Sequence, residues 1–107
     1  MKTVHNKLVR DRIPEIIGAN GQSCLCRTLD DQAYLDALDQ KLNEELAEYQ
    51  QDKSMEELAD LLEVIRAVIA ARGGSYEAVE DIRRAKAEKR GGFEKRIWLV
   101  ETDDSQK

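Results

Sequence analysis

Four carboxylates of this chain fall into two pairs with matched spacing, Glu45 with Glu48 and Glu57 with Asp60. Each pair lies in a stretch with helical periodicity, and residues three apart on a helix are surface neighbours. Two such helices facing each other would gather four oxygen-donor groups around a small volume. Carboxylate oxygens, completed by water and substrate phosphates, are the ligands that Mg²⁺ takes in proteins. The spacing therefore predicts a site for a hard divalent cation.

The apolar pattern around these acids argues against a simple solvated helix face, which is the commoner origin of an acidic run. At about 100° per residue, Glu45 falls inside the apolar stripe of its helix, and Glu57 points almost where Val64 and Val68 point. The stripe containing Glu45 consists of Leu35, Leu38, Leu42, Leu46 and Tyr49. An acid directed at a core is costly unless it is paired or bound to metal. The pattern therefore favours a cation beside Glu45 and Glu57.

A second interpretation applies to Glu57. The run from Ser54 to Glu57 has the pattern of a capping box, in which the third residue after the cap reaches back to the backbone N–H of the cap. Capping would explain Glu57 without a metal, but it would explain neither Asp60 nor the position of Glu45. Both roles remain open for Glu57.

Length and composition indicate one domain, residues 1–107, of a mostly helical class. The net charge of -5 argues against a nucleic-acid polymer as partner, because phosphate neutralisation needs a surplus of Lys and Arg. No apolar run approaches the roughly 18 residues of a membrane span. The first seven residues lack the apolar core of a signal peptide. We therefore expect a cytoplasmic protein with no membrane partner.

Local signals predict four helices and two short strands. The helices are expected from about Ile13 to Ala19, from Asp30 or Asp31 to about Gln51, from Ser54 to Gly73, and from Ser75 to about Arg90. The segments near 22–29 and 93–101 alternate weakly and are predicted to pair with each other, followed by a polar tail from Thr102 to Lys107. The expected fold is mostly α, a compact helical bundle with a small two-stranded β ribbon.

Cysteine and histidine contribute little to the predicted chemistry. Cys24 and Cys26 have no second cysteine pair to join them, and His5 is the sole histidine, so zinc ligation is poorly supported. Their spacing is too close for an ordinary bridge in an extended segment. We expect two free thiols, buried or half-buried, as is common for this residue type.

Basic residues near two segment ends are candidate phosphate contacts. Lys86, Lys89 and Arg90 close the last predicted helix, and Lys7 and Arg10 lie in the lead-in to the first. Arg clamps a phosphate with two hydrogen bonds, and Lys acts as a point charge. Cations in a last helical turn also suit the helix dipole, so capping is an equal explanation for Lys89 and Arg90.

Three segments together resemble a known family. The sequence EELAE at 44–48 followed by ELAD at 57–60 resembles the EExxE…ExxD signature of the all-α nucleoside triphosphate pyrophosphohydrolases, the MazG-like superfamily. NKLVRDRIPEII at 6–17 and RGGF at 90–93 resemble its small single-domain branch, which is similar to phosphoribosyl-ATP pyrophosphohydrolase. The resemblance covers about residues 5–100. Only eight residues separate Glu48 from Glu57, which requires a tight turn near Asp52 and Lys53.

The resemblance implies a hydrolase of acid anhydrides that splits an NTP or dNTP into the monophosphate and pyrophosphate with Mg²⁺ or Mn²⁺. It implies metal ligation by Glu45, Glu48, Glu57 and Asp60, with Glu44 or Glu48 as the proton-accepting catalytic carboxylate. The substrate phosphates would meet Lys7, Arg10, Lys86, Lys89 and Arg90, in a homodimer or homotetramer. Two alternatives stay open: phosphoribosyl-ATP as substrate in histidine biosynthesis, and a non-catalytic helical interaction module.

Overall fold

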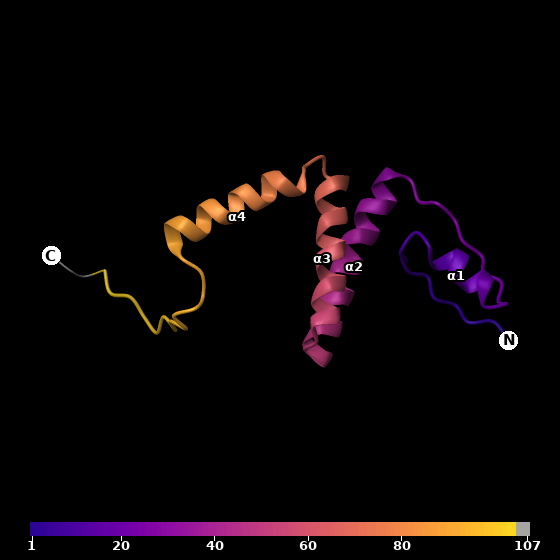
Figure 1. Ribbon diagram of the computed structural model, residues 1–107, viewed down its shortest axis with the longest axis horizontal. Helices are drawn as coiled ribbons and strands as arrows, with labels where there is room; N and C mark the ends of the chain where they lie inside the picture. Colours follow the sequence, from indigo (N-terminus) through magenta and orange to yellow (C-terminus); the bar gives the residue numbers. More distant parts are fainter. Residues whose placement is uncertain (105–107) are drawn as a thin grey trace. The chain divides into compact units, whose positions relative to one another are not determined.

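The computed structural model describes residues 1–104 and is helical throughout its regular parts (Figure 1). In chain order the helices are α1 (Ile13–Ala19), α2 (Asp31–Asp52), α3 (Met55–Ala71) and α4 (Tyr76–Arg90). The mostly α fold class is confirmed, and all four helices lie where they were predicted. The chain divides into two compact units, one from Met1 to Tyr76 and a second from Glu77 onward. The single domain over 1–107 stays a prediction, and its last residues, 105–107 of the predicted polar tail, lie outside the described part.

Helix α1 begins and ends on local signals that are visible in the sequence. Pro14 occupies its first turn, where a missing backbone N–H costs nothing. Its end is fixed by Gly21, which adopts a positive φ of 82°. The chain turns there, and the backbone N–H of Gln22 donates to the carbonyl of Ile17 at 3.2 Å.

A two-residue turn joins α2 to α3. Helix α2 is capped by Asp30, whose carboxylate accepts a hydrogen bond from the backbone N–H of Ala33 at 2.9 Å. The helix ends at Lys53, which takes the left-handed conformation with φ 56°. Ser54 then caps α3 by accepting from the backbone N–H of Glu57 at 3.2 Å. The tight turn predicted near Asp52 and Lys53 is therefore confirmed.

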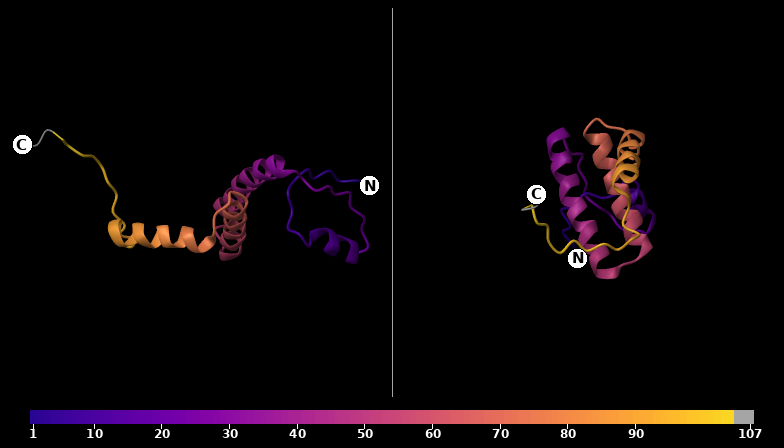
Figure 2. Two further views of the ribbon diagram at one scale, coloured as in Figure 1. Left: turned by 90° about the horizontal axis from the view of Figure 1, so that it is seen from above. Right: turned by 90° about the vertical axis from the view of Figure 1, so that its left-hand side faces the viewer.

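Helices α2 and α3 run back along each other and carry the buried side chains of the first unit (Figures 1 and 2). Leu38 on α2 and Val64 on α3 are the buried apolar residues among those described. Arg72, which directly follows α3, forms an ion pair with Asp39 on α2 at 3.0 Å. Both residues are far in sequence from the turn that joins the two helices. No helix in the described part combines the length and apolarity needed to cross a membrane.

The predicted β ribbon is wrong for the part of the chain that the structure describes. Neither 22–29 nor 93–101 forms a strand there. The first segment belongs to one unit and the second to the other, and no residue of 1–104 is in a strand. A strand without a partner leaves its backbone groups to water. Their apolar side chains are consequently exposed, with Leu25 at 100% and Trp98 at 86% of full exposure.

The expectation of buried cysteines is also wrong. Cys24 and Cys26 are free thiols, as predicted, but both are exposed. They lie in the unpaired segment between α1 and α2, which has no second layer to cover it.

Candidate metal centre

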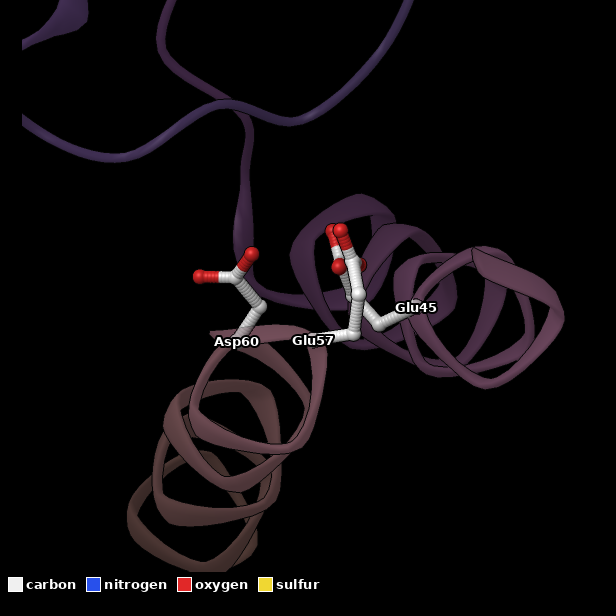
Figure 3. A group of neighbouring side chains, drawn as sticks. All are labelled: Glu45, Glu57 and Asp60. Carbon is white, nitrogen blue, oxygen red and sulfur yellow. The ribbon is translucent and has the colours of Figure 1, made fainter. Parts of the chain in front are cut away.

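Three of the four predicted ligands meet between α2 and α3. Glu45 on α2 and Glu57 and Asp60 on α3 each offer a carboxylate oxygen, and these oxygens all lie within 4.8 Å of one another. Their carboxylates point to the same side of the helix pair (Figure 3). The geometry follows from the sequence spacing, because Glu57 and Asp60 occupy successive turns of α3 and the short inter-helix turn brings them beside Glu45.

Two oxygens of this acidic group are buried without a hydrogen-bond partner. Glu45 is 7% exposed, and neither its Oε2 nor the Oε2 of Glu57 contacts a donor. A buried polar atom normally has a partner, and leaving a charged one without a donor is costly. The two oxygens could be satisfied by a bound cation or, because the pKa values of both glutamates are raised, by a proton.

Two basic side chains border the acidic group and neutralise part of its charge. The Lys41 Nζ lies 3.4 Å from Glu45 Oε1, one helical turn away on α2. Arg10, in the lead-in to α1, donates from Nη2 to Asp60 Oδ1 at 2.7 Å. Each cation contacts one oxygen of the group, and neither contacts the two unpartnered oxygens.

Crowding of like charges is evident in the pKa values of the two glutamates. Burial raises the pKa of Glu45 above its ordinary 4.5, Glu48 raises it further, and Lys41 offsets part of the effect. Burial also raises the pKa of Glu57, with Glu48 and Asp52 as the next causes. A divalent cation would reverse this trend, because an opposite charge favours the ionised carboxylate.

The donor set fits Mg²⁺. Ligand oxygens of an octahedral Mg²⁺ ion lie about 2.9 Å apart when adjacent and about 4.2 Å apart when opposite, so the three carboxylates would have to draw closer together than their 4.8 Å limit to bind one ion. Three carboxylates also leave coordination positions for water and phosphate oxygens, which Mg²⁺ commonly retains. Glu45, Glu57 and Asp60 are thus the residues that could hold the metal.

The remaining predicted acids lie at the border of this group or outside it. Glu48 is exposed and does not join the three, yet it is close enough to raise the pKa of both Glu45 and Glu57. Glu44 is exposed on another side of α2 and is not part of the group. For Glu57, the hydrogen bond that is observed runs from its backbone N–H to Ser54 Oγ, which a residue of any type could donate. The predicted return bond from the Glu57 carboxylate to the Ser54 N–H is not found among the described residues, and the side chain lies alongside that of Glu45 (Figure 3).

The predicted phosphate contacts are distributed over both units. Arg10 lies beside Asp60, whereas Lys7 is exposed in the same lead-in. Lys86, Lys89 and Arg90 are exposed along the end of α4 in the second unit. Arg90 also lines a pocket of 240 Å³ in that unit, together with Gly92, Phe93, Lys95, Arg96 and Ile97.

Sequence reasoning missed several basic residues at these places. Lys41 is four residues before Glu45, a spacing that by itself predicts an ion pair on a helix. Lys95 and Arg96 follow the glycine pair after two intervening residues and could have been grouped with Arg90. The contact between Arg10 and Asp60 had no local signal, because the two residues are 50 positions apart.

Comparison with known proteins leaves the family open. No protein-family model matches the chain, and no solved structure matches it. An uncharacterized protein of Mycolicibacterium smegmatis (strain ATCC 700084 / mc(2)155) is 60% identical over 42 residues, which are 39% of this chain and 43% of that protein. The chain therefore spans less than half the length of the curated relative that it matches.

The metal-free protein is expected to lose stability through Glu45 and Glu57 as the pH rises from 4.5 through their raised pKa values. In that window the folded state binds more protons than the unfolded chain, so the free energy of unfolding falls with increasing pH. Denaturation with a chelator over a pH series, in wild type and in Glu57→Gln, measures this contribution as the difference between the two curves. Identical pH slopes in the two proteins would contradict the prediction.

Proposed function

We propose that the protein is a Mg²⁺-dependent nucleoside triphosphate pyrophosphohydrolase of the MazG-like kind, which hydrolyses an NTP or dNTP to the monophosphate and pyrophosphate. The observation that carries the proposal is the pair of buried, unpartnered oxygens of Glu45 and Glu57, within a group of three carboxylates from two helices. These three residues belong to the EExxE…ExxD pattern that resembles this family. In this proposal the carboxylates bind the metal, and the metal binds the phosphates of an acid-anhydride substrate.

In this proposal Glu45, Glu57 and Asp60 hold the metal, with Glu48 at the edge as a further carboxylate. A bound Mg²⁺ would neutralise phosphate oxygens, orient the triphosphate and acidify an attacking water. Glu48 is the better candidate to accept the proton of that water, because it is exposed and borders two of the proposed ligands. Glu44, outside the group, is less well placed for this role.

The proposed assembly is a compact helical bundle completed by a second or further copy of the chain, as a homodimer or homotetramer. Support comes from the apolar side chains that the first unit leaves in water on α3, namely Leu58, Leu62 and Ile65. A chain of this length has a small core of its own, and association is a common way to enlarge it. Lys86, Lys89 and Arg90 would act on substrate phosphates in that assembly.

The decisive experiment is a pyrophosphate-release assay on the common NTPs and dNTPs and on phosphoribosyl-ATP, with Mg²⁺, with Mn²⁺ and with chelator. We expect release from at least one of these substrates, and only with metal. Preference for phosphoribosyl-ATP would place the enzyme in histidine biosynthesis. Release that persists in chelator would contradict the metal dependence of the proposal. No release from any substrate would contradict the enzymatic proposal as a whole and favour an interaction module.

Arg10 offers a test of the phosphate side of the site. Replacing it with Ala is expected to raise the KM for the nucleotide by roughly 10–100-fold, the loss of one charge-assisted hydrogen bond. Its ion pair with Asp60 is largely exposed, with the two side chains at 57% and 42%, so the stability change should stay below about 1 kcal/mol.

Steady-state kinetics and urea denaturation of the same variant separate the two effects, and Arg10→Lys should recover part of the affinity. A variant that is strongly destabilised but keeps its KM would instead make Arg10 a purely structural residue.

A further inference from the structure

The segment between α1 and α2 carries two thiols in direct contact. Cys26 Sγ lies 3.7 Å from Cys24 Sγ and donates a weak hydrogen bond to it. Both side chains are exposed, and they are the two cysteines of the whole sequence. This pair lies apart from the acidic group and has no role in the proposed hydrolysis.

The backbone around these thiols favours their approach. Residues two apart in an extended segment share a face, but their spacing does not favour an ordinary bridge; in the structure the two sulfurs nevertheless lie in contact. The segment forms no strand, so no ladder of hydrogen bonds fixes its dihedral angles. A disulfide needs about 2.05 Å between the sulfurs, so they must approach by about 1.7 Å from the observed 3.7 Å. An unpaired, exposed segment can supply that movement.

The surroundings favour redox chemistry over metal binding at the two thiols. Soft metals such as zinc need three or four protein ligands. Among the described residues, the group of metal-ligating side chains that reaches three members is the acidic one, and it contains neither cysteine. Two thiols without a third ligand hold such a metal poorly, whereas a pair of neighbouring thiols is sufficient for a dithiol–disulfide couple.

We propose that Cys24 and Cys26 form a reversible dithiol–disulfide couple that is oxidised by low-molecular-weight disulfides such as oxidised glutathione. One cysteine thiolate attacks a sulfur of the oxidised glutathione, forms a mixed disulfide and expels a glutathione thiolate. The second cysteine thiolate then attacks the protein sulfur of the mixed disulfide and expels the other glutathione thiolate. The protein loses two electrons and two protons, and these convert one oxidised glutathione into two reduced ones.

Two features of the site determine the pH dependence of the thiol exchange and the stability of the disulfide. The hydrogen bond with Cys26 raises the pKa of the Cys24 thiol, so exchange through Cys24 should accelerate as the pH rises. A ring closed over a single intervening residue is strained, and strained disulfides are the more reducible ones. The bridge should therefore be labile and reversible.

The test uses the reduced full-length protein, treated with oxidised glutathione, quenched by an alkylating reagent and measured by intact mass. Wild type is expected to lose the mass of two hydrogen atoms and to retain no glutathione. Cys24→Ser and Cys26→Ser should each retain one glutathionyl group, because the resolving thiol is missing. Wild type that retains two glutathionyl groups, or that becomes a disulfide-linked dimer, would overturn the proposal.

A matched control keeps two cysteines but separates them. In Cys26→Ser combined with Gln51→Cys, the second thiol lies at an exposed position near the end of α2, where the helix holds it away from Cys24. In glutathione buffers the control should form its bridge at least about tenfold less favourably, a difference of about 30 mV for this two-electron couple. Equal bridging in wild type and control would show that contact between the sulfurs is irrelevant. The assay uses neither Mg²⁺ nor nucleotide, so its outcome is independent of the proposed hydrolysis.

Discussion

Replacing Asp60 with asparagine is expected to lower the rate of Mg²⁺-dependent pyrophosphate release by roughly 10²–10³-fold, the usual effect of deleting one group that stabilises charge at a reacting centre. Asparagine keeps the shape of the side chain and retains an oxygen that can accept the hydrogen bond from Arg10. What it removes is the negative charge that Asp60 contributes to the acidic group. Initial rates at saturating nucleotide, measured over a Mg²⁺ series, give the change in kcat and in metal dependence.

Glu56→Gln is the matched control for this experiment. Glu56 is exposed in the first turn of the same helix and lies outside the acidic group, so the substitution removes one charge nearby without touching the site. Its rate should stay within about twofold of wild type, as expected for surface substitutions. Circular dichroism should show the same helix content in both variants. Full activity in Asp60→Asn would remove Asp60 from the metal site.

The helices of this protein could be predicted because their ends are encoded locally. Asp30 and Ser54 cap the backbone N–H groups three residues later, and Gly21 supplies the positive φ that ends α1. These interactions span a few residues and depend little on the rest of the fold. Periodicity then placed Glu45 among apolar neighbours, and the structure finds it buried.

The errors arose where structure depends on distant partners. The segments 22–29 and 93–101 carry strand-like residues, but a strand forms only when a second segment satisfies its backbone, and no local pattern specifies one. The predicted burial of Cys24 and Cys26 failed for the same reason, since no layer covers their segment. The ion pair between Arg10 and Asp60 spans 50 positions, beyond what spacing rules describe.

The acidic group could be predicted from the sequence only in part. Its members could be predicted because spacing sets the face of each helix, and the short turn sets which faces meet. The role of each member could not be predicted, because the direction in which a side chain points changes within a fraction of a helical turn. Glu48 belongs to the same motif as Glu45, yet it is exposed at the border, while the Glu57 side chain lies beside Glu45 and makes no capping bond to Ser54.

Addition of Mg²⁺ to the metal-free protein is expected to raise its melting temperature by about 10 °C at a concentration near 100 times its Kd, since binding then adds about 2.7 kcal/mol to the free energy of unfolding. The physical reason is the unfavourable electrostatics of the folded acidic group, where Glu45 and Glu57 have raised pKa values and two unpartnered oxygens. Differential scanning calorimetry with chelator and with increasing Mg²⁺ measures the shift, and Na⁺ at matched ionic strength controls for general screening.

Glu57→Gln makes this experiment more discriminating, because the substitution should raise the melting temperature without metal and reduce the stabilisation by Mg²⁺. Without metal, the variant should melt above wild type, since it removes a carboxylate that Glu48, Asp52 and burial already disfavour in its charged form. With Mg²⁺, it should gain less than wild type, because one ligand oxygen with full charge is gone. The order of the two melting temperatures is therefore expected to reverse between chelator and saturating Mg²⁺. A group that only faces solvent would give no such reversal, because the substitution would then shift the melting temperature equally with chelator and with Mg²⁺. A variant that melts lower than wild type in both conditions would show that Glu57 is needed for packing instead of for the metal.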